Sequence, residues 1–181
     1  MNIKYSVLAI LLSAMITSSS ASAQTPITTE MTQKYYEQCL VNSKTEGTMT
    51  DQSRQTYCAC TAENMKKNMV IEDLQAMQGQ DQAARDAINK VLIDVNGPCM
   101  HVPLHDKVYT KCMTDVNKTS ICQCLSKGIS EYLSKQSQTL LKDILAKNPN
   151  IYDPMGALMD TQEYKTTEKR IALSCATGSA Y

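Results

Sequence analysis

The apolar residues of this chain recur every three to four positions in six main segments, and no stretch alternates cleanly between apolar and polar residues. A period near 3.6 residues is typical of amphipathic helices, whereas alternation would indicate strands. The pattern therefore predicts an all-α protein with essentially no sheet. The segments cover residues 28–40, 58–69, 81–95, 108–113, 122–133 and 160–173, with shorter apolar stretches at 70–77 and 140–145.

The first half is expected to hold three main helices. One face of the first helix carries Met31, Tyr35 and Cys39. Residues 42–53 are polar and aperiodic, so we expect a loop there and a second helix that begins near Cys58. One face of that helix carries Cys58, Ala62, Met65 and Met69. The third helix is expected to end at Asn96-Gly97-Pro98, and its inward positions are Ala84, Ala87, Ile88, Val91 and Leu92.

The second half repeats this scheme. Helices are expected through Val108 and Cys112, from Cys122 to Leu133, and around residues 140–145. Residues 148–154 contain two prolines and two asparagines, which indicates a turn-rich loop. A closing helix over residues 160–173 then leads to the last cysteine.

The eight cysteines fall into two sets of four with the same order. The first set is Cys39, Cys58, Cys60 and Cys99, and the second is Cys112, Cys122, Cys124 and Cys175. A tyrosine precedes the first cysteine of each set by three residues, and apolar residues follow each Cys-x-Cys after five and nine residues. The chain is therefore interpreted as two tandem copies of a roughly three-helix, four-cysteine unit, at residues 24–100 and 108–181, joined by a linker at 101–107.

The Cys-x-Cys spacing restricts how the cysteines pair. Two residues of helix turn the chain by about 200°, so the two cysteines of each triplet face different neighbours. A bridge inside the triplet would be strained, and each cysteine is better placed to reach a separate helix. We expect all eight cysteines to be oxidised, with bridges only within each set, while the pairing inside a set stays open. Each bridge of the first unit closes a loop of roughly 20–40 residues, worth on the order of 3–4 kcal/mol.

Residues 1–23 are predicted to be a cleaved signal peptide. Lys4 is the only charge before the apolar run of residues 5–16, and Ala21-Ser22-Ala23 is a small-x-small cleavage site. The run is shorter than the roughly 20 residues that a membrane span needs, and no later segment approaches that length. The mature chain, starting at Gln24, is therefore expected to be periplasmic or secreted, without a membrane span. Export places the cysteines where thiols become oxidised.

The charge balance argues against a nucleic-acid partner. The chain has 18 basic and 18 acidic residues, and removal of the signal peptide takes away only Lys4. A nucleic-acid-binding protein would need a strong basic excess. The chain also has no Phe and no Trp, so the predicted core is lean and depends on its cross-links.

Two histidines in the linker were weighed as metal ligands. His101 and His105 lie four residues apart, which on a helix would make a metal pair, but Pro103 between them argues against regular helix. We interpret them as ordinary histidines of a solvated linker and predict no metal and no cofactor. Both histidines lie in this one segment, so no nucleophile with a supporting base can be assembled from the sequence.

The function predicted from these observations is the binding of another protein. A signal peptide before a small disulfide-tied helical body is similar to the architecture of periplasmic binding, inhibitor and immunity proteins of bacteria. The rival interpretation is a thiol-disulfide or copper-handling protein that uses Cys58 and Cys60 or Cys122 and Cys124, since thiolates and methionines suit monovalent copper. Methionine is, however, a general core filler, which favours burial of Met65 and Met69. No catalytic residues are predicted.

Overall fold

The computed structural model describes residues 24–44, 47–151 and 153–179, and the predicted signal peptide lies outside them. The described chain is helical, with an isolated bridge between Pro26 and Val70 and no strand in these ranges, so the all-α prediction is confirmed. The α-helices are α1 (Thr29–Asn42), α2 (Asp51–Asn68), α3 (Ile71–Ala76), α4 (Gln82–Lys90), α5 (His101–Asp115), α6 (Thr119–Lys147), α7 (Pro154–Asp160) and α8 (Gln162–Thr177). A π-helix, η1 (Val91–Asn96), and a 3-10 turn, η2 (Gly97–Cys99), lie between α4 and α5.

The second helix begins earlier than the apolar pattern indicates. Helix α2 starts at Asp51, and the hydroxyl of Thr50 caps it by accepting a hydrogen bond from the Ser53 amide at 3.1 Å. Residues 51–57 are mostly polar and face the solvent. They therefore show no apolar repeat that would indicate their two helical turns. The prediction that the loop extends to residue 53 is therefore wrong, because α2 begins at Asp51. Cys58 lies in the interior of α2 and not near its start.

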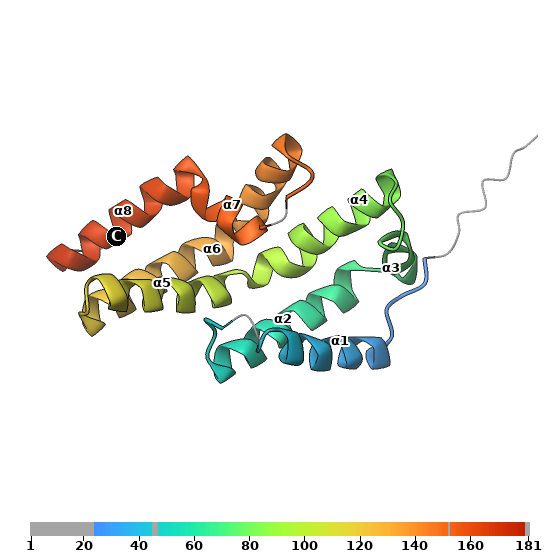
Figure 1. Cartoon of the computed structure of the whole chain (residues 1–181), viewed down its shortest axis with the longest axis horizontal. Coiled ribbons are helices and arrows are strands. Elements are labelled where there is room, and N and C mark those ends of the chain that lie inside the picture. The colour runs from blue at the N-terminus through green and yellow to red at the C-terminus, as the bar shows by residue number, and fades with distance from the viewer. Residues whose placement is uncertain (1–23, 45–46, 152, 180–181) are drawn as a thin grey trace, which may run out of the picture.

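The segment from α4 to α5 is one bent helical run instead of two helices joined by a linker. It crosses the middle of the molecule, with α1 and α2 on one side and α6, α7 and α8 on the other (Figure 1). The expected non-helical linker at residues 101–107 is wrong, because these residues form the first turns of α5. Pro103 is its third residue, where the amide would have no partner within the helix, so proline is tolerated. Ile88, expected to point inward, is 45% exposed.

The bend between α4 and α5 is held by side chains from both sides. Its freed carbonyls accept hydrogen bonds from Asn68 of α2, at 2.9 Å to Asp94 O, and from Gln138 of α6, at 3.2 Å to Ile93 O. Ser137, also on α6, donates to the Gly97 carbonyl at 2.6 Å. A π-helical turn leaves carbonyls without their usual partners, so these three side chains stabilise the bend and join it to α2 and α6.

The second half departs from the prediction in the length of its central helix. Helix α6 has 29 residues and merges the two helices expected at 122–133 and around 140–145. The polar stretch between them stays helical because Ser137 is buried against the bend. The turn-rich loop is found before α7, a short helix that the sequence did not predict, and α8 is the expected closing helix.

The buried apolar side chains form two clusters. One lies in the first half and contains Ile27, Met65, Met69 and Val95. The other contains Met100, Leu104, Val108, Ile129, Leu133, Leu140, Leu141, Leu158, Tyr164 and Ile171. Val95 of the first cluster lies within the bend, and Met100 of the second cluster directly follows it. Met65 and Met69 are core residues, in agreement with the packing interpretation.

Candidate functional site

Four disulfides tie the helices together, and their pairing is the same in the two cysteine sets. In each set the first cysteine is bonded to the second and the third to the fourth. The bonds are Cys39–Cys58, Cys60–Cys99, Cys112–Cys122 and Cys124–Cys175. No bridge forms inside a Cys-x-Cys triplet and none joins the two sets, so both pairing predictions are confirmed. The proposed tandem repeat itself stays a prediction.

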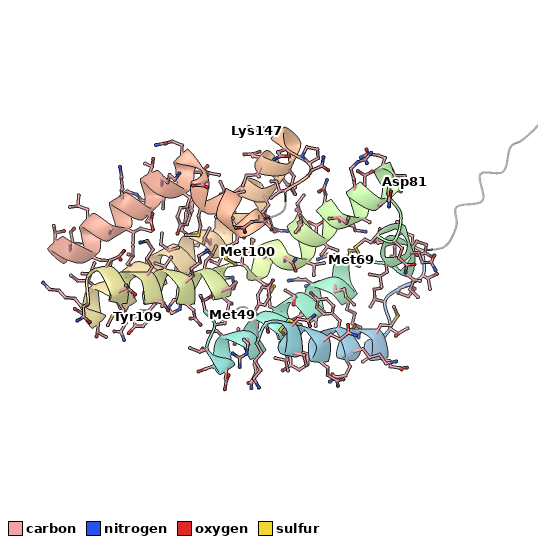
Figure 2. The ribbon with its side chains drawn as sticks, in the orientation of Figure 1. Met49, Met69, Asp81, Met100, Tyr109 and Lys147 are labelled. Carbon is pink, nitrogen blue, oxygen red and sulfur yellow. A yellow bond between two sulfur atoms is a disulfide. The ribbon has the colours of Figure 1, made fainter. Side chains whose placement is uncertain are left out.

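These disulfides are placed as structural cross-links. Figure 2 draws the side chains on the ribbon, and each bridge joins cysteines of different elements or helices. Cys58, Cys99 and Cys122 have no exposed surface, and Cys112 is 5% exposed. An attacking thiolate must reach a sulfur atom of the bond that it exchanges with. Burial therefore protects at least one sulfur atom of three of the four bridges.

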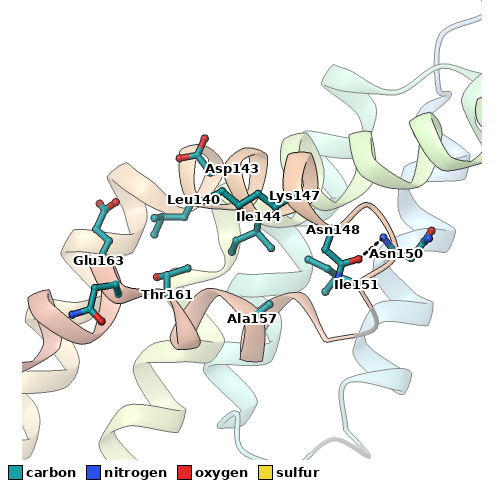
Figure 3. A pocket seen from close by; sticks show the side chains of 11 residues that line it. Leu140, Asp143, Ile144, Lys147, Asn148, Asn150, Ile151, Ala157, Thr161 and Glu163 are labelled. Atoms are coloured by element: carbon teal, nitrogen blue, oxygen red, sulfur yellow. Dashed lines mark hydrogen bonds between the residues drawn. The ribbon is translucent and has the colours of Figure 1, made fainter.

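A groove of about 550 Å³ lies between the C-terminal part of α6 and the segment from the following loop to the start of α8. We call it the α6–α7 groove. Its lining residues are Leu140, Asp143, Ile144, Lys147, Asn148, Asn150, Ile151, Ala157, Thr161, Gln162 and Glu163 (Figure 3). Ligand sites in proteins are commonly 300–1,000 Å³ with an apolar lining and a few polar groups. The α6–α7 groove falls within this range, and sequence analysis did not predict it.

The walls of the α6–α7 groove are fixed by local hydrogen bonds. Asp153 caps α7 by accepting a hydrogen bond from the Gly156 amide at 2.8 Å, and Pro154 occupies the first helical position. Thr161 ends α7 and caps α8, since its hydroxyl donates to Leu158 O at 2.8 Å and accepts from the Tyr164 amide at 3.1 Å. These caps stabilise the ends of the two helices that form one wall of the groove.

The floor of the α6–α7 groove is apolar and its rim is charged. Leu140 and Ile144 of α6 face Ala157 of α7 and Ile151 of the loop across the groove. Asp143 and Lys147 stand on the rim one helical turn apart, and the structure gives neither of them an ion pair with a described residue. Charged side chains that have no ion pair with a described residue can interact with a ligand bound on the apolar surface beside them.

Glu163 contributes a second carboxylate to this rim. Its Oε1 accepts a hydrogen bond from the Tyr132 hydroxyl at 2.8 Å, which positions the carboxylate at the start of α8. Burial and the bond to Glu163 raise the pKa of Tyr132 to about 12, so the phenol stays a neutral donor at physiological pH. The carboxylate is thus held in place while one of its oxygens has no bond to a described residue.

A second polar cluster lies where α2, α5 and α6 meet. Asp106 is 7% exposed and accepts hydrogen bonds from the Thr50 amide and from Nδ1 of His105, both at 2.9 Å. Because a carboxylate only accepts, Nδ1 carries a proton, and Nε2 of the neutral ring can then accept from the Ser126 hydroxyl at 3.1 Å. The result is an Asp106–His105–Ser126 relay in the order used by hydrolytic triads.

This relay corrects the statement that no nucleophile and base can be assembled. It exists because Pro103 does not interrupt α5, so His105 is fixed on a helix that packs along α6, where Ser126 lies. The 21-residue separation of His105 and Ser126 gave no local signal. Ser126, however, has no exposed surface, so a substrate carbonyl cannot approach its oxygen. The relay therefore acts as a polar connection between α5 and α6, with its two ends buried and the His105 side chain partly exposed.

The two histidines are four residues apart on α5, but their rings take separate partners. Nδ1 of His101 donates to Pro98 O at 2.9 Å, while His105 bonds Asp106 and Ser126. No group of three or more histidine, cysteine or acidic side chains suited to a metal ion occurs in the part of the chain that the structure describes. Likewise, none of the described helices has the length and apolarity needed to cross a membrane.

Comparison with known proteins gives no family for this fold and groove. No protein-family model, no curated protein and no solved structure matches the chain.

Proposed function

We propose that this protein is exported through a signal peptide cleaved after Ala23 and acts outside the cytosol by binding another protein, without catalysis. Four disulfides are typical of proteins in oxidising compartments, which supports export. The chain after the predicted cleavage site is well anchored, since the Thr25 amide and hydroxyl donate to the Glu72 carboxylate and Ile27 is buried. Cleavage at this position would leave those contacts intact.

The α6–α7 groove is the observation that carries the binding proposal. It combines an apolar floor with charges that no described residue pairs, on a helix that two disulfides anchor to its neighbours. Apolar area supplies affinity, and polar groups at the rim supply orientation and specificity. A protein segment is the proposed partner, because the groove runs along α6 from Leu140 to Lys147 and continues to the exposed Asn148 and Asn150 of the following loop. Inhibitor, immunity and accessory proteins work in this way.

The rival proposal, thiol-disulfide or copper chemistry at the Cys-x-Cys triplets, receives less support. Each triplet cysteine is bonded to a different helix, and the first cysteine of each triplet is fully buried. Such a function would need at least one structural bridge to be reduced first. Counting titratable thiols in the freshly isolated protein, with and without copper, decides between the two proposals.

Site-specific photo-crosslinking in the native host tests the binding proposal. A photoreactive amino acid replaces Ile151 in the groove in one variant and Ala146 in a matched variant, since Ala146 is exposed on α6 and does not line the groove. We expect a discrete crosslinked protein from position 151 and none from position 146. Equal crosslinking from both positions, or none from position 151, would contradict the proposal. Sequencing the N-terminus of the isolated protein checks cleavage before Gln24.

A further inference from the structure

The charges of the α6–α7 groove differ along its length, and this restricts what can bind. Asp143, Leu140 and Glu163 lie toward one end, while Asn148, Asn150 and Ile151 lie at the other (Figure 3). Lys147 follows Asp143 by one turn of α6, so the rim changes sign along the helix. A ligand that matches this pattern can bind in only one direction.

The acidic end would favour a cation. Asp143 is exposed and has no ion pair with a described residue. Glu163 uses Oε1 to accept the Tyr132 hydroxyl, and no described residue donates to its Oε2. Both carboxylates are exposed on the rim at this end of the groove, so this end carries negative charge that an ammonium or guanidinium group can approach. A carboxylate in the same place would be repelled by both of them, so charge selects between ligands here.

The floor next to this acidic end would favour an apolar side chain. Leu140 lines the groove at this end although it is only 4% exposed, and the half-buried Ile144, Ala157 and Ile151 continue the apolar surface toward the loop. Lys147, Asn148 and Asn150 can donate hydrogen bonds at the far end, where a ligand must present acceptors. Backbone carbonyl groups of a bound peptide are such acceptors.

We infer that the α6–α7 groove binds a short protein segment in which a lysine or arginine stands beside a leucine, isoleucine or methionine. This rests on the proposed function and names the partner chemistry at the same site. The basic side chain lies at the acidic end of the rim, near Asp143 and Glu163, and the apolar side chain covers Ile144 and Ile151, which are half-buried. The charges determine direction and specificity, while the apolar contact supplies most of the affinity.

A display library of random ten-residue peptides, panned on the mature, disulfide-bonded protein, tests this inference. Counterselection uses Ala157→Leu, which fills part of the groove with an apolar side chain of good helix propensity. Peptides that bind the wild type but not Ala157→Leu are expected to be enriched in lysine or arginine next to an aliphatic residue. Enrichment of acidic residues, or of apolar residues with no charge preference, would overturn the inference while leaving the proposed function standing.

If no enriched peptide loses binding when the groove is filled, both the inference and the proposed binding site fail.

Where a peptide is enriched, its affinity for the wild type is compared with its affinity for the double variant Asp143→Asn and Glu163→Gln. Exposed ion pairs are worth up to about fivefold in affinity each, so binding should weaken by about three- to twentyfold, and less in high salt. The matched control is Glu30→Gln with Glu37→Gln, which removes two carboxylates from α1 on the other side of the molecule and should leave affinity unchanged (Figure 1). Equal weakening by both double variants would contradict the assignment.

Discussion

The substitution Asp106→Asn removes the charge at the junction of α2, α5 and α6 with little change in shape. The Asp106 carboxylate accepts the Thr50 amide and the His105 ring, both at 2.9 Å, and it is 7% exposed. An asparagine amide can still accept one of these bonds, but its NH₂ group faces the protonated Nδ1 of His105. Losing one charge-assisted hydrogen bond in a buried site should lower the free energy of unfolding by about 1.5–3 kcal/mol.

Urea unfolding of the oxidised protein at neutral pH measures this loss. The control is Asp115→Asn, because Asp115 is also an acidic residue of α5 but has a 53% exposed side chain paired with Lys111. Exposed pairs of this kind contribute about 0–1 kcal/mol. A loss for Asp106→Asn no larger than that of the control would refute the assigned role of the junction.

The pH dependence of the free energy of unfolding gives an independent test of the role of the Asp106 charge. Burial opposes ionisation of Asp106, but hydrogen bonds from His105 and the Thr50 amide outweigh it and hold the pKa of Asp106 below its ordinary value of 3.8. A carboxyl group with a lowered folded-state pKa stabilises the protein above the unfolded-state pKa, and this stability is lost as the pH falls through the folded-state pKa. The difference between wild type and Asp106→Asn should therefore shrink in acid. A difference that is constant down to strongly acidic pH would contradict this account.

Three further predictions concern the bend, the core and the cross-links. Gly97→Ala places a methyl group 3.2 Å from Gln138 Cγ and Leu141 Cδ1 and should cost about 1–3 kcal/mol in urea unfolding, and an unchanged stability would mean that the bend is not tightly packed against α6. Leu133→Ala, at a site with no exposed surface, should cost about 2–5 kcal/mol by the same assay, and a smaller loss would mean that the second core is loosely packed. Thiol titration in denaturant should find no free thiol before reduction and eight after it, and any thiol before reduction would contradict the four-bridge structure.

The sequence was sufficient to predict the helical class and the restriction on disulfide pairing. Both follow from local geometry, since helical periodicity places residues on faces and a Cys-x-Cys triplet cannot bridge itself. The sequence pattern did not predict the helix boundaries that depend on tertiary contacts. Ser137 keeps α6 helical by bonding Gly97 across the bend, and no pattern around Ser137 indicates that contact. Pro103 was interpreted by its general preference, although its position in the first turn of α5 removes the cost.

The candidate site lay beyond sequence analysis for a related reason. The α6–α7 groove depends on the length of α6 and on the short helix α7, and neither was predicted. In the sequence, the charged residues of the groove are isolated polar residues on solvent-exposed helix faces, and they form no recognisable motif. Only the fold brings Asp143 and Glu163 to the same groove, just as only the fold brings Ser126 to His105.

Retention of the native partner by a matched pair of variants tests the central claim most directly. Ala157→Leu fills the α6–α7 groove, while Ala146→Leu makes the same change at an exposed position of α6 outside it. Each variant is expressed in the native host, and the partner identified by crosslinking is quantified by mass spectrometry after gentle isolation. We expect Ala146→Leu to retain the partner at the wild-type level and Ala157→Leu to lose most of it, with both variants equally stable in urea. Equal retention by the two variants would contradict the claim that this protein binds its partner through the groove.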